Sequence, residues 1–131
     1  MPAATPLSFS LLPQRFVVAR LAADAAIPPA LLTAPGLVSI TRTAEELSLV
    51  CAEDIAPDLP QAVAGWRCLM LHGPFAFDQV GILAALLQPL AAAGVGIFAL
   101  STFDTDYLLV QAEQLAPALA ALQGAGHRLL P

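Results

Sequence analysis

The chain has 131 residues, of which 58% are hydrophobic and only 11% are charged, and its formal net charge is −5 at pH 7. Five Lys and Arg side chains cannot form the basic patch that a nucleic-acid backbone requires, so we expect no nucleic-acid partner. Because globular domains average about 45–50% apolar and about 25% charged residues, the apolar excess predicts that part of the surface is buried in an oligomer.

The first half of the chain predicts short elements. Apolar residues at 7–12 and 15–21, separated by Pro13-Gln14, are typical of a hairpin. A short helix with Pro28 in its first turn and two strands follow, at residues 27–33, 37–41 and 47–53. Two prolines mark residues 54–61 as a linker.

The second half gives a clearer pattern. Residues 66–72 are typical of a buried strand, which Gly73-Pro74 ends. Asp78 is a helix-capping residue, and the apolar spacing predicts a helix over residues 79–93, which Gly94 ends. The predicted apolar face of this helix consists of Ile82, Leu83, Leu86, Leu87 and Leu90.

The remaining residues predict two strands, a helix and a last strand. The strands at 97–101 and 106–111 are joined by a polar turn. A helix begins near Gln114, with Pro117 in its first turn, where proline is tolerated, and residues 127–130 form the last strand. The order of strand, helix, strand, strand, helix and strand is that of a βαββαβ unit.

The chain also contains an internal echo, because residues 40–50 align with residues 100–110. Each segment has a strand, a hydroxyl residue, a polar turn, an acidic residue and a strand, and Glu46 corresponds to Asp106. The match predicts two βαββαβ-like units, of which the first is degenerate, over residues 1–60 and 61–131. We therefore expect an α+β protein with antiparallel sheets and helices on one face.

The two cysteines, Cys51 and Cys68, indicate the compartment. Residues 1–15 lack the basic segment and apolar core of an export signal. Two cysteines without such a signal are typical of reduced core thiols, so we expect a cytoplasmic protein.

An uncharged stretch over residues 79–103 is long enough to cross a bilayer. Pro89 and the glycines at 94 and 96 interrupt it, and Asp78 and Asp104 flank it where a membrane helix carries Lys and Arg. We therefore expect no membrane segment.

Four segments carry a resemblance to a known family: SITRTAEELSLV (39–50), GWR (65–67), FDQVGI (77–82) and STFDTDY (101–107). With these motifs the chain resembles the small tandem ACT-domain proteins of bacteria. It is also similar to the ACT domains of the eukaryotic cytosolic arginine sensor and, more distantly, of aspartate kinases. The resemblance implies a ferredoxin-like fold, sheet pairing between subunits in a homodimer, and amino-acid binding at a domain interface.

The candidate site combines two features. The helix start after Asp78 offers unpaired N–H groups for a carboxylate, and Ser101, Thr102 and Asp106 offer hydroxyl groups and a negative charge. By resemblance, a second ACT domain contributes positions such as Gly96 and Ile97. The expected ligand-binding residues are Ala76, Phe77, Asp78, Gln79, Gly81, Ile82, Gly96, Ile97, Ser101, Thr102, Phe103 and Asp106.

Simpler roles compete with this assignment. Asp78 is also an ordinary helix cap, and Asp104 and Asp106 also favour a tight hairpin turn. His72 and His127 fit the ends of strands, without the neighbours of a zinc site. Gln79 stands where the arginine sensor has an acidic residue, which argues against arginine as the ligand.

The sequence offers no activated nucleophile, no acid–base pair and no metal cluster, so we expect no catalytic residue, no metal and no cofactor. The favoured interpretation is a non-catalytic sensor that binds a small molecule, an amino acid, at an interface between ACT domains. The alternative is a structural or protein-interaction module whose ligand site is vestigial.

Overall fold

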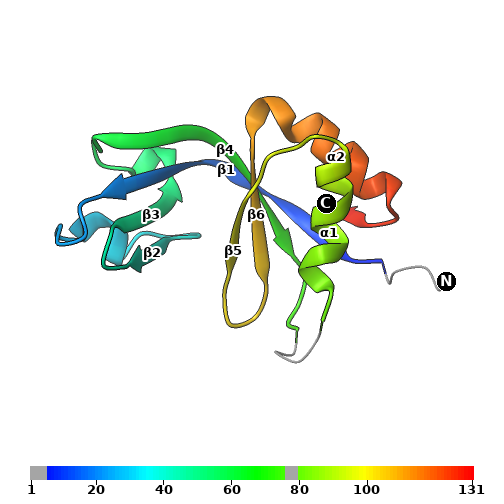
Figure 1. The fold of residues 1–131 in the computed structure, drawn as a ribbon, viewed down its shortest axis with the longest axis horizontal. Coiled ribbons are helices and arrows are strands. Elements are labelled where there is room, and N and C mark those ends of the chain that lie inside the picture. Colours follow the sequence, from blue (N-terminus) through cyan, green and yellow to red (C-terminus); the bar gives the residue numbers. More distant parts are fainter. Residues whose placement is uncertain (1–5, 76–79) are drawn as a thin grey trace. The chain divides into compact units, whose positions relative to one another are not determined.

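A computed structural model describes residues 6–75 and 80–131 (Figure 1). Its contacts divide the chain into two compact units. We call Pro13–Trp66 the inner unit, and Met1–Leu12 with Arg67–Pro131 the terminal unit. The strands β1 (Ser8–Leu21) and β4 (Gln61–Leu71) each contribute residues to both units.

β1 corrects the first sequence prediction. The expected hairpin around Pro13-Gln14 is absent, because 8–21 form one continuous strand. The φ angle of proline fits extended backbone, and proline is tolerated in a strand where no partner needs its N–H. Pro13 is exposed and lies where β1 passes from the terminal unit to the inner unit.

The inner unit contains β2 (Ser39–Arg42) and β3 (Leu47–Ala52), and its strands follow the order β2-β3-β1-β4. β3 pairs antiparallel with both β1 and β2, and Leu49 lies opposite Ala19. Two 3₁₀ turns complete the unit, η1 (Pro29–Leu32) in place of the predicted helix and η2 (Glu53–Ile55). Its buried core consists of Val17, Ala19, Leu31, Leu47, Leu49 and Cys51.

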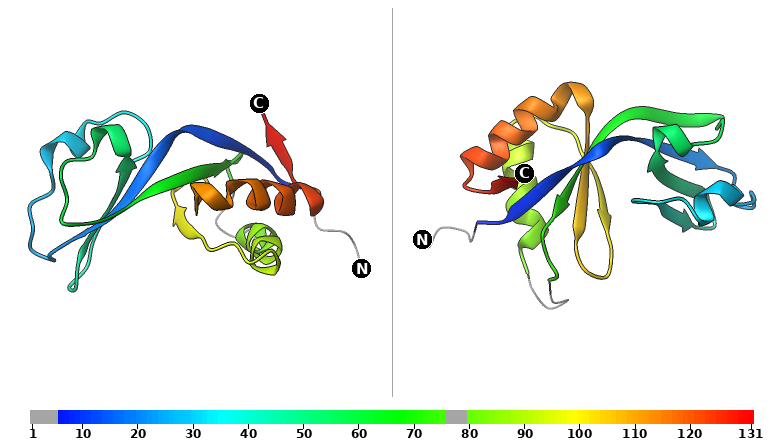
Figure 2. Two further views of the ribbon diagram at one scale, coloured as in Figure 1. Left: turned by 90° about the horizontal axis from the view of Figure 1, so that it is seen from above. Right: turned by 180° about the vertical axis from the view of Figure 1, so that it is seen from behind.

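The terminal unit has the predicted order of elements. These are α1 (Ile82–Ala92), β5 (Phe98–Ser101), β6 (Asp106–Gln111), η3 (Ala112–Gln114), α2 (Leu115–Gly124) and β7 (Arg128–Leu130). The strands follow the order β1-β4-β6-β5, and β7 pairs with β1 in parallel, with Leu129 opposite Phe9. Both helices lie on the same face of these strands, which confirms the α+β expectation (Figure 2).

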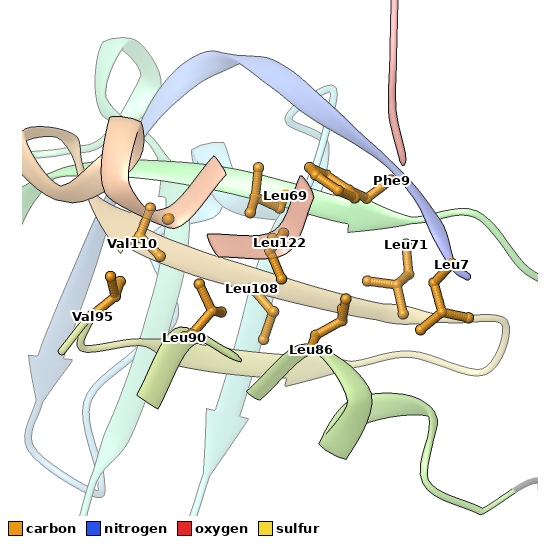
Figure 3. Packing of buried hydrophobic residues seen from close by; sticks show 11 residues of the cluster. Leu7, Phe9, Leu69, Leu71, Leu86, Leu90, Val95, Leu108, Val110 and Leu122 are labelled. Atoms are coloured by element: carbon orange, nitrogen blue, oxygen red, sulfur yellow. The ribbon is translucent and has the colours of Figure 1, made fainter. Parts of the chain in front are cut away.

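The alternation of side chains along each strand explains why the helices pack on one face. Leu69 and Leu71 of β4, and Leu108 and Val110 of β6, lie two positions apart and point to the same core, where Phe9 joins them (Figure 3). The helices contribute buried residues spaced four apart, Leu86 and Leu90 from α1 and Ala118 and Leu122 from α2. The predicted face of α1 is thus centred on Leu86 and Leu90, while Leu83 and Leu87 are half-buried.

α1 begins later than the predicted residue 79. Val80 is not helical, and Gly81 is the N-cap residue with a φ of 77°. This left-handed backbone is open to glycine at little cost and cannot continue a right-handed helix, so the first turn starts at Ile82. The predicted cap, Asp78, lies outside the described residues.

The C-terminal part of α1 contains Pro89, which has no N–H to donate to the carbonyl group of Ala85 four residues earlier. His127 supplies that donor, because its Nε2 lies 2.9 Å from the Ala85 carbonyl oxygen. The other ring nitrogen, Nδ1, accepts the backbone N–H of Leu7 at 3.1 Å, which assigns the proton to Nε2. The buried imidazole thereby joins α1, β7 and the residue before β1.

The internal echo is present in the structure, but one position away from the predicted alignment. In both turns a threonine N–H donates to a carbonyl three residues later, Thr43 to Glu46 and Thr102 to Thr105, at 2.8 Å. The two hairpins therefore align with an offset of 59 residues, not 60, because both turns have the same length between paired strands. Asp106 consequently corresponds to Leu47 and not to Glu46.

None of the helices in the described parts of the chain is long and apolar enough to cross a membrane.

Candidate functional site

The β5–β6 turn is hydrogen-bonded to the residues that follow β4, at one edge of the terminal unit. The backbone N–H of Phe75, in the segment after β4, donates to the Asp104 carbonyl oxygen at 3.0 Å. The Thr105 hydroxyl donates to the Leu71 carbonyl oxygen at 2.9 Å. A Cβ atom on Gly73 would lie 2.9 Å from the Asp104 carbonyl oxygen, so glycine permits this close approach. The β5–β6 turn and the segment that leads to α1 are thus held side by side.

Within the β5–β6 turn the predicted polar residues bond to one another. The Ser101 hydroxyl donates to Oδ1 of Asp106 at 2.5 Å. The Thr102 hydroxyl closes the turn, because it donates to the Thr105 carbonyl at 3.2 Å and accepts the Thr105 N–H at 3.4 Å. Phe103 lies in the turn with 77% of its surface exposed. The hydroxyl groups of Ser101 and Thr102 therefore form hydrogen bonds within the hairpin, and the half-buried Asp106 provides a negative charge.

Gly81 and Ile82, at the start of α1, line an open pocket of about 820 Å³. Much of its wall is apolar and consists of Leu7, Phe75, Val80, Ile82, Ala85 and Leu130. This volume lies in the range of roughly 300–1,000 Å³ that is usual for small-molecule sites. The pocket lies wholly within the terminal unit.

One polar pair lies at the wall of this pocket. His72 and Ser8 line it, and Nε2 of His72 lies 2.5 Å from the hydroxyl of Ser10. The His72 N–H donates to the Ser8 carbonyl at 2.9 Å, which places the end of β4 beside the start of β1. Sequence reasoning placed His72 correctly at a strand end and missed the pocket. The only local signal was a histidine directly after a buried strand, because the pocket needs residues from both ends of the chain.

Gly96 and Ile97 lie away from the other predicted residues of the same chain. They follow the C-terminal end of α1, whose 11 residues separate them from Gly81 by about 16 Å. The N–H of Gly96 donates to Oε1 of Gln114 at 3.3 Å, and Nε2 of Gln114 donates to the Gly94 carbonyl at 3.4 Å. Ala76, Phe77, Asp78 and Gln79 lie outside the described residues.

The cysteines have the properties of core residues. Cys51 and Cys68 are both free and buried. Burial raises the pKa of the Cys68 thiol to about 12, and burial together with the nearby charge of Asp54 raises the pKa of Cys51. A raised pKa suppresses the thiolate, which is the nucleophilic form. Among the described residues, no three His, Cys, Asp or Glu side chains are grouped as a metal site would require.

The terminal unit has two helices over one face of its strands, and the strand order includes β4-β6-β5. Together with the βαββαβ order of elements, this arrangement defines a ferredoxin-like α+β domain. Residues 61–124 match the family model described as the ACT domain, and residues 14–58 match a model of an N-terminal domain. Residues 61–124 therefore contain an ACT domain.

Two solved structures share the fold of this chain. A crystal structure of a protein from Agobacterium tumefaciens is 43% identical, with a TM-score of 0.89, and the match covers 97% of this chain and 94% of that one. The regulatory subunit of aspartate kinase from Thermus thermophilus shares the fold, with a TM-score of 0.62 at 16% identity over 89% of this chain and 95% of that one.

The cytosolic arginine sensor for mTORC1, subunit 1, of Homo sapiens is 37% identical over 59 residues. This match covers 44% of the chain and only 18% of the sensor's own length. The ACT-domain match and the similarity to a sensor support a regulatory role for the chain.

Proposed function

We propose that this chain is a non-catalytic regulatory protein that binds a small molecule, an amino acid, at an interface between the ACT domains of two subunits. The observation that carries the proposal is the hydrogen bonding of Phe75 to Asp104 and of Thr105 to Leu71. These bonds hold the polar turn beside residues 71–75, and we propose that groups for both ends of an amino acid lie at this edge. The similarity to an arginine sensor supports an amino acid as the ligand.

In this proposal, Asp106 accepts the ligand's ammonium group. Its Oδ1 atom is already oriented by the Ser101 hydroxyl, which fixes the carboxylate before a ligand arrives. The N–H groups at the start of α1, whose N-cap residue Gly81 has no side chain, receive the ligand's carboxylate. The other ligand-binding residues that we propose are those predicted from the sequence.

The second subunit supplies Gly96 and Ile97, since α1 separates them from Gly81 within one chain. β5 stands at the end of the strand order, and an edge strand is available for pairing between two copies in a cytoplasmic homodimer. We also propose that the boundary between the two sequence domains, 1–60 and 61–131, lies between the two family-model matches.

Two chemical observations support a protein without catalysis. The raised pKa of the Cys68 thiol disfavours its nucleophilic form. Both ring nitrogens of His127 are engaged with backbone groups, so this imidazole is not available as a general base.

Thermal unfolding of the full chain against each of the twenty amino acids tests the proposal. An amino acid at about a hundred times its Kd should raise Tm by roughly 10 °C. Asp106→Asn should abolish this rise, whereas Asp104→Asn, an exposed carboxylate in the same turn, should retain it. Sedimentation should show a dimer. A panel in which no amino acid changes Tm contradicts the proposal.

The alternative, an interaction module with a vestigial site, is favoured by the exposed apolar side chains of Phe103, at 77% exposure, and Leu32, at 64%. A fixed partner that copurifies with the chain, is lost in Phe103→Ser and is indifferent to amino acids would favour this function over the first.

A further inference from the structure

We propose that the pocket beside α1 receives the side chain of the ligand amino acid, and that it selects a large aliphatic or aromatic side chain. This inference rests on the proposed function and names the ligand class of that site. The pocket is continuous with the candidate site, because Gly81 and Ile82 line it and Phe75, which also lines it, bonds to the polar turn.

The chemistry of the wall favours an apolar ligand. Aliphatic surface comes from Leu7 before β1, Ile82 in α1 and Leu130 in β7. Phe75 adds an aromatic ring. Among the described lining residues no carboxylate, ammonium or guanidinium group is present. A charged side chain placed against these described lining residues would lose its hydration without gaining a counter-charge from them, whereas an apolar side chain gains from leaving water.

Val80 adds an independent observation. It is an apolar residue with 91% of its surface exposed, and it lines the same pocket. An apolar side chain within the pocket would cover Val80 and the neighbouring wall, which removes this surface from water on binding. The polar pair of His72 and Ser10 lies at the wall and offers one hydrogen-bonding position.

The acidic residue of the candidate site is compatible with an apolar ligand. Asp106 does not line the pocket, and every free amino acid carries an ammonium group at its main-chain end. A single carboxylate therefore matches that ammonium group, and the side chain of the ligand is read separately by the pocket.

Calorimetric titration of the full chain tests the inference. Leucine, isoleucine, methionine and phenylalanine are compared with arginine, lysine, aspartate and serine. We expect the best ligand to belong to the first group and to bind at least about tenfold more tightly than serine, which lacks the apolar body.

Two variants locate the ligand. Ala85→Leu adds three carbon atoms to the pocket wall and should weaken the best ligand by at least about tenfold, since a methylene-scale clash is felt in a fitted site. Ala84→Leu is the matched control, because Ala84 is its exposed neighbour on α1 and does not line the pocket. Val80→Ser should also weaken binding and, because Val80 is exposed, should leave the fold unchanged.

The possible results separate the inference from the proposed function. A best ligand with a charged or small polar side chain overturns the inference and leaves the function standing. So does an apolar ligand whose Kd is unchanged in both Ala85→Leu and Val80→Ser. A chain that binds no amino acid overturns both.

Discussion

The buried imidazole of His127 permits a quantitative test of how α1 tolerates its proline. In His127→Leu, the Leu7 N–H and the Ala85 carbonyl oxygen lose the partners that they have at 3.1 Å and 2.9 Å. An unsatisfied buried group costs about 1–3 kcal/mol, and the Ala85 carbonyl is only partly buried, so its share is near the lower end. We expect His127→Leu to lower the free energy of unfolding by about 2–4 kcal/mol.

The contribution of the Ala85 carbonyl can be separated by restoring its helical partner. Pro89→Ala introduces an N–H four residues after Ala85, which donates to this carbonyl in a regular helix. His127→Leu should then cost about 1 kcal/mol less in the Pro89→Ala background than in the wild type. Urea unfolding of the four proteins, followed by circular dichroism, measures this coupling.

Pro117→Ala is the matched control, because Pro117 lies in the first turn of α2, where helical N–H groups lack intrahelical partners. Its effect should add to that of His127→Leu without coupling. Equal costs of His127→Leu with and without Pro89 would refute the argument that the imidazole replaces the missing helical donor. A cost below about 0.5 kcal/mol would refute the burial argument itself.

Three further predictions follow from the core, the thiol and the turn. Leu86→Ala, at 1% exposure, should cost about 2–5 kcal/mol in urea unfolding, and the half-buried Leu83→Ala clearly less; equal costs would contradict the observed face of α1. The folded Cys68 thiol keeps its proton until about pH 12 whereas the ordinary value is 9.0, so its contribution to stability is lost as pH rises from 9 to 12. The free energy of unfolding should therefore decline less steeply between pH 9 and 12 for Cys68→Ala than for the wild type. Parallel curves of this free energy against pH would exclude the burial effect. Thr105→Val removes the hydroxyl that bonds the Leu71 carbonyl and should cost about 1 kcal/mol, while Thr33→Val, an exposed control, should be neutral in the same assay.

Local patterns predicted the elements whose ends are set by local chemistry. The apolar strand predicted at 66–72 overlaps β4, which begins at Gln61 and ends at Leu71, and the strands at 97–101 and 106–111 correspond to β5 and β6. The polar residues between them form a turn because Thr102 bonds to the residue three positions later, an interaction that depends on neighbours alone.

The errors occurred where local preference and context differ. Pro13 suggested a turn, but extended backbone accommodates its φ angle, so β1 continues through it. At the start of α1, the acidic residue at 78 suggested an early cap, while the left-handed backbone of Gly81 delays the helix. A glycine inside an apolar stretch carries no mark in the sequence that shows which sign its φ angle takes.

The candidate site divides in the same way. Its polar turn was predictable from residues 101–106, and its ligand-binding assignment stays a prediction. The pocket was not predictable, because Leu130 reaches it only through the parallel pairing of β7 with β1. That pairing joins residues about 120 positions apart, and periodicity contains no information on such contacts.

His127 connects the long-range pairing with the pocket. Its two ring nitrogens bond to Leu7 and Ala85, and both of these residues line the pocket. Because the Leu7 carbonyl also accepts the Arg128 N–H at 2.8 Å, β7, the start of β1 and α1 are fixed around one imidazole. A ligand that presses on the Ala85 wall therefore acts on the same hydrogen bonds that hold β7 in place. Replacing His127 should accordingly weaken ligand binding as well as folding, although its side chain is 5% exposed and does not line the pocket.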